Sequence, residues 1–348
     1  MGYREYAKHE IMKKSKLLVQ NGGINELAEI EVNGEKQYIL IEGADRTKPF
    51  CMFMHGGPGS PFPYGVSART LYPEITENCV AVYYDQRGAG KSYHRSSDIG
   101  KMSLEQFVAD ANVVVDYVRK QYNQEKVYIV GQSFGTIIAT QIVAEHPEKF
   151  HAYIGFAQIT SIIEGQSLAY EWLIKEARSQ NNTKTLQKLD KIGEAPYFGE
   201  REDQFSTLIN EYKGFNYSDE VVSKANLFSL VKGALTSPDY SLADIYKTFI
   251  SGADFSINQA QSLKEEIIRT NFFETVPTIQ VPVYIIQGRH DKQASYDLAR
   301  DYYEALDAPQ GKSFFTLENS AHIPNKTDEK IFVEHLQKII GNKEIQLE

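Results

Sequence analysis

Along the first third of the chain, hydrophobic residues occur in short blocks whose spacing is typical of β-strands. Two half-polar blocks, 27–32 and 35–41, flank Asn33-Gly34, a dipeptide that favours the tight turn of a β-hairpin. Longer apolar runs without charged residues are typical of strands covered on both faces, as in a parallel sheet. These runs lie at 50–54, 79–84, 127–130 and 281–286, and further strands are predicted at 151–156 and 313–317.

Helical periodicity follows several of these strand blocks. The clearest helix is predicted at 103–120, where apolar residues three and four positions apart form one stripe, and Ser103 with Gln106 can form a capping box. Further helices are predicted at 134–145, 294–305 and 328–340. Strands that alternate with helices in this way predict an α/β fold with a doubly wound, mostly parallel sheet and right-handed crossovers.

The rhythm of the pattern changes in the middle of the chain. Strand-like runs disappear there, and amphipathic stretches rich in Tyr and Phe follow one another, separated by helix-breaking residues. The breaks lie at Pro196, Gly214 and Pro238. We therefore predict one α/β core domain, made of residues 1–159 and 271–348, with a helical cap inserted at 160–270.

The composition is that of an ordinary folded protein, because 42% of the 348 residues are hydrophobic and 24% are charged. The net charge of −9 and the scattered Lys and Arg residues argue against nucleic acid or an anionic membrane surface as a partner. The apolar stretch 17–19 is too short for a signal peptide, and no segment approaches a membrane span, so a cytoplasmic protein is expected. The oligomeric state stays open, and residues 343–348 are expected to form a frayed tail.

The two cysteines, Cys51 and Cys79, lie inside apolar runs and belong to no Cys-x-x-Cys motif or Cys/His cluster. We expect both to be buried as small hydrophobic residues. No metal site and no cofactor are predicted.

Residues 131–135 read Gly-Gln-Ser-Phe-Gly and place Ser133 between a buried strand and a helix. Gly-x-Ser-x-Gly in this setting is typical of a nucleophile elbow, a tight turn that presents the serine hydroxyl at the carboxyl end of the strand. The structural alternative is a serine that only caps the helix within a glycine turn. To act as a nucleophile at neutral pH, a serine needs a neighbouring base, usually a histidine oriented by a carboxylate.

Two downstream loops supply these partners in the chain order of the nucleophile-elbow hydrolases, namely serine, acid and histidine. Asp291 follows the strand at 281–286 and His322 follows the strand at 313–317, where ligand sites of open α/β sheets collect. We predict His322 as the general base and Asp291 as its orienting carboxylate. The competing candidates are His290 for the base, and Glu318 and Asp254 for the acid.

A glycine-rich loop follows the strand at 50–54 and reads His-Gly-Gly-Pro-Gly. Such a loop can bring backbone N–H groups close to a substrate carbonyl and stabilise the oxyanion. The predicted donors are the N–H groups of Gly57 (or Gly56) and of Phe134, the residue after the nucleophile. His55 is expected to hold its own loop in place rather than act as a base.

The segment 85–92 contains Gly-x-Gly-Lys-Ser and superficially suggests phosphate binding. It lacks the Gly-x-x-x-x-Gly-Lys frame of a P-loop. The better interpretation is a loop that is braced by the charges of Asp85 and Arg87.

Taken together, these motifs resemble the proline iminopeptidase branch of the α/β hydrolases. The resemblance rests on His-Gly-Gly-Pro-Gly at 55–59, Asp-Gln-Arg-Gly at 85–88, the Ser133 elbow and the Asp291/His322 pair, and it covers 25–158 and 275–342. It implies an α/β-hydrolase fold with a helical cap over the active site. It also implies release of an N-terminal residue, often proline, from short peptides.

Two departures from that family's pattern bear on the substrate. The elbow reads Gly-Gln-Ser-Phe-Gly where the iminopeptidases typically have Gly-Gly-Ser-Trp-Gly, and no segment resembles the one that carries their main amine-binding acid. The candidate substitutes are Glu164, Glu171 and Glu194, while Trp172 and Tyr170 could line the substrate site beside Gly56. Each is also compatible with a solvated helix face or with the core of the cap.

The sequence therefore predicts a serine hydrolase. The favoured hypothesis is an aminopeptidase that releases N-terminal proline or a small apolar residue from short peptides through an acyl-enzyme. The alternative within this fold is a carboxylesterase or amidase for small-molecule esters or amides. A non-catalytic binding protein is the third hypothesis. Haloalkane dehalogenases and epoxide hydrolases are disfavoured because they carry Asp at the position of Ser133.

Overall fold

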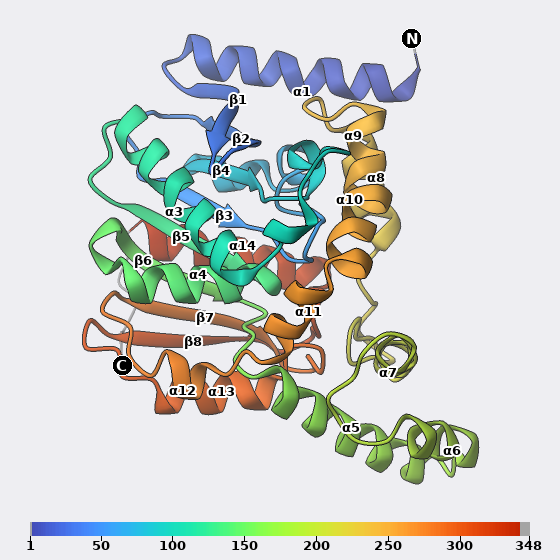
Figure 1. Ribbon diagram of the computed structural model, residues 1–348. Helices are drawn as coiled ribbons and strands as arrows, with labels where there is room; N and C mark the ends of the chain where they lie inside the picture. Colours follow the sequence, from blue (N-terminus) through green and yellow to red (C-terminus); the bar gives the residue numbers. More distant parts are fainter. Residues whose placement is uncertain (1, 342–348) are drawn as a thin grey trace.

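A single eight-stranded β-sheet crosses the molecule, with helices on both of its faces (Figure 1). The computed structural model describes residues 2–341. The strands lie in the order β1-β2-β4-β3-β5-β6-β7-β8. Their bounds are β1 Ile24–Val32, β2 Glu35–Gly43, β3 Phe50–Met54, β4 Val80–Asp85, β5 Val127–Gln132, β6 Phe150–Phe156, β7 Val283–Gly288 and β8 Lys312–Leu317. β1, β2 and β4 pair antiparallel and all other neighbours are parallel, which confirms the predicted mostly parallel sheet.

Alternate residues of each central strand point to opposite faces of the sheet, so that each face has its own core. On β3, Met52 and Met54 join the core under α3, α4 and α13, whereas Cys51 and Phe53 join the core under α2 and α14. The helix bounds are α2 Ala68–Leu71, α3 Leu104–Gln121, α4 Phe134–Glu145, α12 Phe272–Thr275, α13 Tyr296–Ala305 and α14 Lys326–Ile340. Both Cys51 and Cys79 are buried as free thiols, which confirms the expectation for them.

The predicted hairpin turn forms, and the predicted capping box forms in part. Asn33 and Gly34 join β1 to β2 with positive φ angles of 47° and 83°, as a two-residue hairpin turn requires. At the start of α3, Ser103 Oγ accepts the N–H of Gln106 at 3.2 Å. The reciprocal half of the predicted capping box does not form, because the Gln106 side chain donates to Asp110 at 2.8 Å.

The N-terminal helix α1 (Tyr3–Gln20) is not predicted by the hydrophobic pattern, and it lies across the β1 side of the molecule (Figure 1). Most of its side chains are exposed or half-buried, and Ser15 is its buried residue. The Ser15 hydroxyl donates to Glu42 at 2.9 Å, and Glu42 forms a buried ion pair with Arg69 at 2.8 Å. A polar anchor of this kind leaves no signal in hydrophobic periodicity, which explains why the helix is missed.

Between β6 and α12 the described chain forms a series of helices, which in Figure 1 line one side of the sheet. Their bounds are α5 Ile162–Ser179, α6 Thr183–Ile192, α7 Glu200–Glu211, α8 Leu227–Thr236, α9 Leu242–Tyr246, α10 Gly252–Asp254 and α11 Gln261–Ile268. Two π-helical turns, Lys247–Ser251 and Phe255–Gln259, flank α10. Pro196, Gly214 and Pro238 fall in the loops between α6 and α9. α5 and α6 project away from the sheet.

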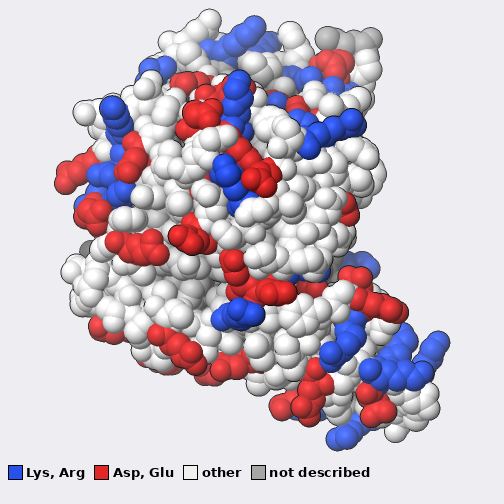
Figure 2. Space-filling model, viewed as in Figure 1, with Lys and Arg blue, Asp and Glu red and all other residues white. Residues whose placement is uncertain are grey.

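Acidic and basic side chains are interspersed on the face shown in Figure 2. Within residues 2–341, no helix has the length and apolar content needed to cross a lipid bilayer. Short 3-10 turns lie at Pro73–Glu77, Gly90–Ser92, Ile99–Lys101 and Pro147–Lys149. The predicted frayed tail at 343–348 lies outside the described residues.

Candidate active site

Ser133 lies on a strained turn between β5 and α4. Its φ and ψ angles are 49° and −121°, a region that residues with a side chain rarely adopt. The flanking glycines make this turn possible. A Cβ at Gly135 would lie 2.1 Å from the Met54 carbonyl oxygen, and a Cβ at Gly131 would lie 2.9 Å from the Gly135 carbonyl oxygen. The turn therefore has the geometry of a nucleophile elbow.

A chain of hydrogen bonds joins the Ser133 hydroxyl to His322 and Asp291. Ser133 Oγ lies 3.1 Å from His322 Nε2, and His322 Nδ1 lies 3.0 Å from Asp291 Oδ2. Asp291 is fully buried, and its Oδ1 accepts the backbone N–H groups of Gln293 and Ala294 at 2.9 and 2.8 Å. Because an ionised carboxylate only accepts, Nδ1 carries the proton that points to Asp291, and Nε2 is free to accept the serine proton.

The loop after α7 connects the inserted helices to this chain of hydrogen bonds. The Gly214 carbonyl accepts the N–H of Lys292, next to Asp291, at 2.9 Å, and the Phe215 carbonyl accepts the N–H of Ile323, next to His322, at 3.2 Å. The Phe215 ring also stacks on the His322 imidazole, with centroids 5.3 Å apart. The close approach requires glycine at 214, where a Cβ would lie 2.9 Å from Lys292 Cβ.

The residues that competed in the sequence for the roles of acid and base have other partners in the structure. His290 stacks on Tyr217 with ring centroids 3.6 Å apart, and Glu318 forms an ion pair with Arg289 at 2.7 Å. Asp254 is exposed and accepts hydrogen bonds from Asn258 and Gln259. Among the described residues, no group of three or more His, Cys, Asp or Glu side chains is arranged to hold a metal ion.

His55 is completely buried beside the elbow and has both ring nitrogens occupied. Its Nδ1–H donates to the Gly56 carbonyl at 2.7 Å, and its Nε2 accepts the backbone N–H of Gln86 at 3.2 Å. The Gln86 side chain returns a hydrogen bond to the His55 carbonyl at 2.8 Å. Burial lowers the pKa of His55 to about 4, so the ring is neutral and fastens the glycine loop to the end of β4.

Two residues with predicted oxyanion-binding N–H groups line the space around Ser133. Gly57 and Phe134 both line cavities that include Ser133, and no acceptor among residues 2–341 takes their N–H groups. Phe134 is the first residue of α4, where the helix dipole favours negative charge. Gly56 also lies close to the nucleophile candidate, because a Cβ there would be 3.3 Å from Ser133 Cβ. The arrangement is suited to an oxyanion next to the hydroxyl.

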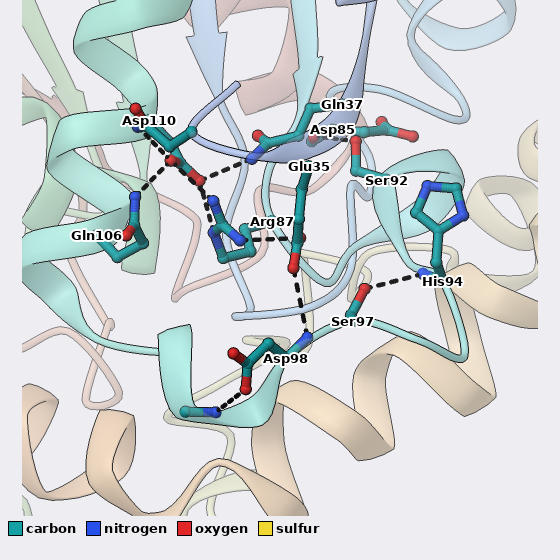
Figure 3. A network of polar contacts seen from close by, with 12 residues as sticks. Glu35, Gln37, Asp85, Arg87, Ser92, His94, Ser97, Asp98, Gln106 and Asp110 are labelled. Atoms are coloured by element: carbon teal, nitrogen blue, oxygen red, sulfur yellow. Dashed lines mark hydrogen bonds and ion pairs between the residues drawn. The ribbon is translucent and has the colours of Figure 1, made fainter. Parts of the chain in front are cut away.

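Buried charges hold the segment 85–92, and Figure 3 shows those of Arg87 and Asp110. Gln86 of this segment contacts His55 at the start of the glycine loop. Arg87 donates to Asp110 at 2.7 and 3.0 Å, and its Nη1 lies 2.9 Å from Glu35. Side-chain amides donate further hydrogen bonds to Asp110, and these come from Gln37, Gln106 and Asn33. These contacts agree with the prediction of a loop braced by charges.

Asp85 connects the same segment to the inserted helices. Its carboxylate accepts the backbone N–H of Lys91 at 2.8 Å and the hydroxyl of Tyr240 at 2.5 Å. Burial raises the pKa of Asp85 to about 7, although these hydrogen bonds favour the ionised form. Tyr240 is buried in the loop between α8 and α9, so this contact joins the β4 end to the inserted segment.

Replacing Arg87 with methionine should lower the free energy of unfolding by about 3–5 kcal/mol, because the buried Asp110 and the half-buried Glu35 would lose their cation. Urea unfolding followed by circular dichroism measures this change. The matched control is Arg269→Met, since Arg269 is 77% exposed and lies 3.9 Å from Glu265. The control should change stability by less than about 1 kcal/mol. Equal effects of the two substitutions would contradict a bracing role for Arg87.

Two cavities meet at Ser133 and His322. The larger has a volume of about 590 Å³ and extends from Gly56 and Gly57 to Glu329. Its walls are mostly aromatic and apolar, with polar side chains contributed by α7. These lining residues include Phe62, Pro63, Tyr64, Tyr72, Phe156 and Leu230, together with Ser206, Thr207 and Asn210 of α7. The smaller cavity, of about 200 Å³, lies beside α5 and α11 and contains the ion pair of Glu202 and Lys264 at 3.2 Å.

Of the residues predicted from the sequence to bind substrate, only some line these two cavities. Gly56 lines the larger one, but Glu164 and Glu171 are exposed on α5, and Trp172 packs edge-on against Tyr212 at 6.4 Å. Two weaker candidates, Glu194 and Tyr170, also lie away from the two cavities. Glu194 is exposed, and the Tyr170 hydroxyl donates to the Leu189 carbonyl at 3.1 Å. The physical reason is the phase of α5, which turns Gly165 and Gln166 toward the smaller cavity and its glutamates toward solvent.

Three residues at the site are not found from the sequence. Gln287 on β7 is buried and donates to Asp291 at 3.2 Å and to the Ala294 carbonyl at 2.6 Å. Gln293 lines both cavities, and Glu329 on α14 lines the larger. Gln287 could have been found as a polar residue that continues the strand just before the predicted acid. Glu329 offers no such signal, because it reads as an acidic residue in the first turn of a helix.

The chain is similar to known hydrolases in sequence and in fold. Residues 48–197 match the family described as "Serine aminopeptidase, S33". A probable aminopeptidase of Bacillus subtilis (strain 168), YbaC, is 30% identical over 315 residues, which are 90% of this chain and 95% of that protein. A proline iminopeptidase of Heyndrickxia coagulans is 24% identical over 276 residues, covering 78% of this chain and 83% of that one. The crystal structure of a Mycobacterium smegmatis proline iminopeptidase superposes with a TM-score of 0.62 at 14% identity, covering 91% and 98% of the two chains.

Proposed function

Because this chain belongs to the proline iminopeptidase-like α/β hydrolases, we propose that it is a serine hydrolase with Ser133 as its nucleophile. The relatives support a hydrolase of this fold, and the serine mechanism is our proposal. The observation that carries it is the unbroken hydrogen-bond chain from Ser133 through His322 to the buried Asp291. A serine that only capped α4 would have no need of a histidine and a carboxylate in this order.

In the proposed reaction, Ser133 Oγ attacks the substrate carbonyl carbon while His322 Nε2 takes the hydroxyl proton. Asp291 keeps His322 in the tautomer that can accept this proton and stabilises the resulting imidazolium. The N–H groups of Gly57 and Phe134 donate to the oxyanion. His322 then protonates the leaving amine or alcohol, and it deprotonates the water that hydrolyses the acyl-enzyme.

We infer that the substrate is a short peptide whose N-terminal residue is proline or small and apolar. The named activities of the Bacillus subtilis and Heyndrickxia coagulans relatives support this choice, as does the largely apolar wall of the 590 Å³ cavity. In this proposal residues 160–270 act as a cap over a core of residues 1–159 and 271–348. The contributions of Asn210 and Leu230 to the cavity wall support that role.

A small-molecule esterase or amidase is the second candidate. It is favoured by the exposed positions of Glu164 and Glu171, the residues expected to bind a substrate amine. Aromatic and apolar walls also accept neutral acyl groups. The same nucleophile, base and acid would serve this reaction.

Purified protein should hydrolyse proline 7-amido-4-methylcoumarin with a kcat/KM at least about 100-fold above that for its N-acetylated analogue, because acetylation removes the charge that an aminopeptidase recognises. Fluorescence measures both reactions, and p-nitrophenyl butyrate serves as the ester comparison. Ester turnover without cleavage of any free-amine amide would reject the aminopeptidase in favour of the esterase. Failure of a fluorophosphonate probe to label Ser133 would favour the non-catalytic alternative.

A further inference from the structure

The larger cavity at Ser133 has an uneven charge distribution. Among the described residues that line it, Glu329 is the only carboxylate, and none is a lysine or an arginine. The other titratable lining groups are His322 and the tyrosines Tyr64 and Tyr72. The cavity thus offers one negative charge and no positive one to whatever occupies it.

Glu329 is half-buried, and a single side chain among residues 2–341 donates a hydrogen bond to its carboxylate. The hydroxyl of the buried Tyr72 donates to Glu329 Oε1 at 3.1 Å, and Glu329 takes part in no ion pair of residues 2–341. Burial raises the pKa of Glu329 in spite of Tyr72 and of the exposed Lys326. A partly desolvated carboxylate with one partner gains from a cation placed against it.

The carboxylate of the smaller cavity differs in this respect. Glu202 is already paired with Lys264 at 3.2 Å, so a ligand cation there would have to displace a cation of the protein. Of the two cavities that meet at the nucleophile, the larger is therefore the one whose charge suits an ammonium group.

We propose that Glu329 binds the protonated amino group of the substrate and that Tyr72 positions its carboxylate. The inference rests on the proposed aminopeptidase function and names the group that recognises the free amine. It assigns the amine to the core helix α14 rather than to the inserted helices, where the sequence led us to expect it. The fitting substrate combines one ammonium group with an apolar acyl portion that packs against Phe62, Tyr64 and Phe156.

The principal test compares wild type with Glu329→Gln on proline 7-amido-4-methylcoumarin and on p-nitrophenyl butyrate. Glutamine can still accept the Tyr72 hydrogen bond but carries no charge. We expect the ratio of kcat/KM for the amine substrate to kcat/KM for the ester to fall about 30- to 100-fold, mainly through KM of the amine substrate. Tyr72→Phe should lower the same ratio about 3- to 10-fold, again through KM. Glu334→Gln, on the exposed side of α14, should leave the ratio unchanged.

A second measurement does not depend on peptide cleavage. Butylammonium ion should slow fluorophosphonate labelling of Ser133 in the wild type, and Glu329→Gln should need at least about 10-fold more of it for the same protection. Unchanged protection in Glu329→Gln, or an unchanged substrate ratio, would overturn the assignment of Glu329. Protection that depends on Glu329 in a protein that cleaves no free-amine amide would instead reject the aminopeptidase proposal and leave the cation site standing.

Discussion

Replacing Ser133 with alanine should reduce kcat for amide or ester substrates by about 10⁶-fold and abolish labelling by a fluorophosphonate probe. Alanine removes only the Oγ atom that lies 3.1 Å from His322, so no acyl-enzyme can form. The strained backbone at 133 already carries a Cβ, and alanine therefore fits the turn without a new steric conflict. Circular dichroism and the urea unfolding midpoint should match those of the wild type.

The control for this substitution is Ser179→Ala at the end of α5, whose hydroxyl donates to the Glu176 carbonyl on the exposed side of the inserted helices. It should keep full turnover and full labelling. Turnover by Ser133→Ala above about 1% of the wild-type value would mean that another group is the nucleophile. Mass spectrometry of the labelled peptide would identify that group.

Replacing Asp291 with asparagine should reduce kcat by about 10⁴-fold, because it changes the tautomer of His322. Oδ1 of Asp291 accepts two backbone N–H groups, from Gln293 and Ala294, so the asparagine oxygen is held in that position. The asparagine NH2 group must then face His322 Nδ1 and donate to it. The ring proton moves to Nε2, which can no longer accept the proton of Ser133.

The rate of fluorophosphonate labelling and the steady-state kcat measure this effect together. Both should fall in Asp291→Asn, and labelling should still reach completion, because the nucleophile is present but poorly activated. Asp297→Asn is the matched control on α13, since Asp297 is 66% exposed and pairs with Lys292 at 3.3 Å. A loss of less than about 10-fold in Asp291→Asn would show that Asp291 does not control the His322 tautomer.

The sheet and the residues at its carboxyl edge can be predicted from the sequence because their signals are local. Strands such as β4 are buried on both faces and read as unbroken apolar runs. Ser133 directly follows the buried strand β5, and Asp291 and His322 lie in the loops after β7 and β8. Chain order then predicts their association. The hydrogen bonds among them agree with that prediction.

The cavity wall could not be predicted in the same way. Glu164 and Glu171 lie on an amphipathic helix whose phase depends on what it packs against, and this information is absent from the helix itself. Glu329 belongs to a helix of the core, and only the folded chain brings Tyr72 to it. The same holds for α1, whose attachment through Ser15 is polar rather than apolar.

The loop at 214–215 also limits how the inserted helices can move. The carbonyls of Gly214 and Phe215 accept the N–H groups of Lys292 and Ile323, which fastens this loop to the residues next to Asp291 and His322. An opening that separates α7 from the core at that point would break two backbone hydrogen bonds and unstack Phe215 from His322. We therefore expect a motion that opens the cavity to leave this loop in place, and with it the positions of Asp291 and His322.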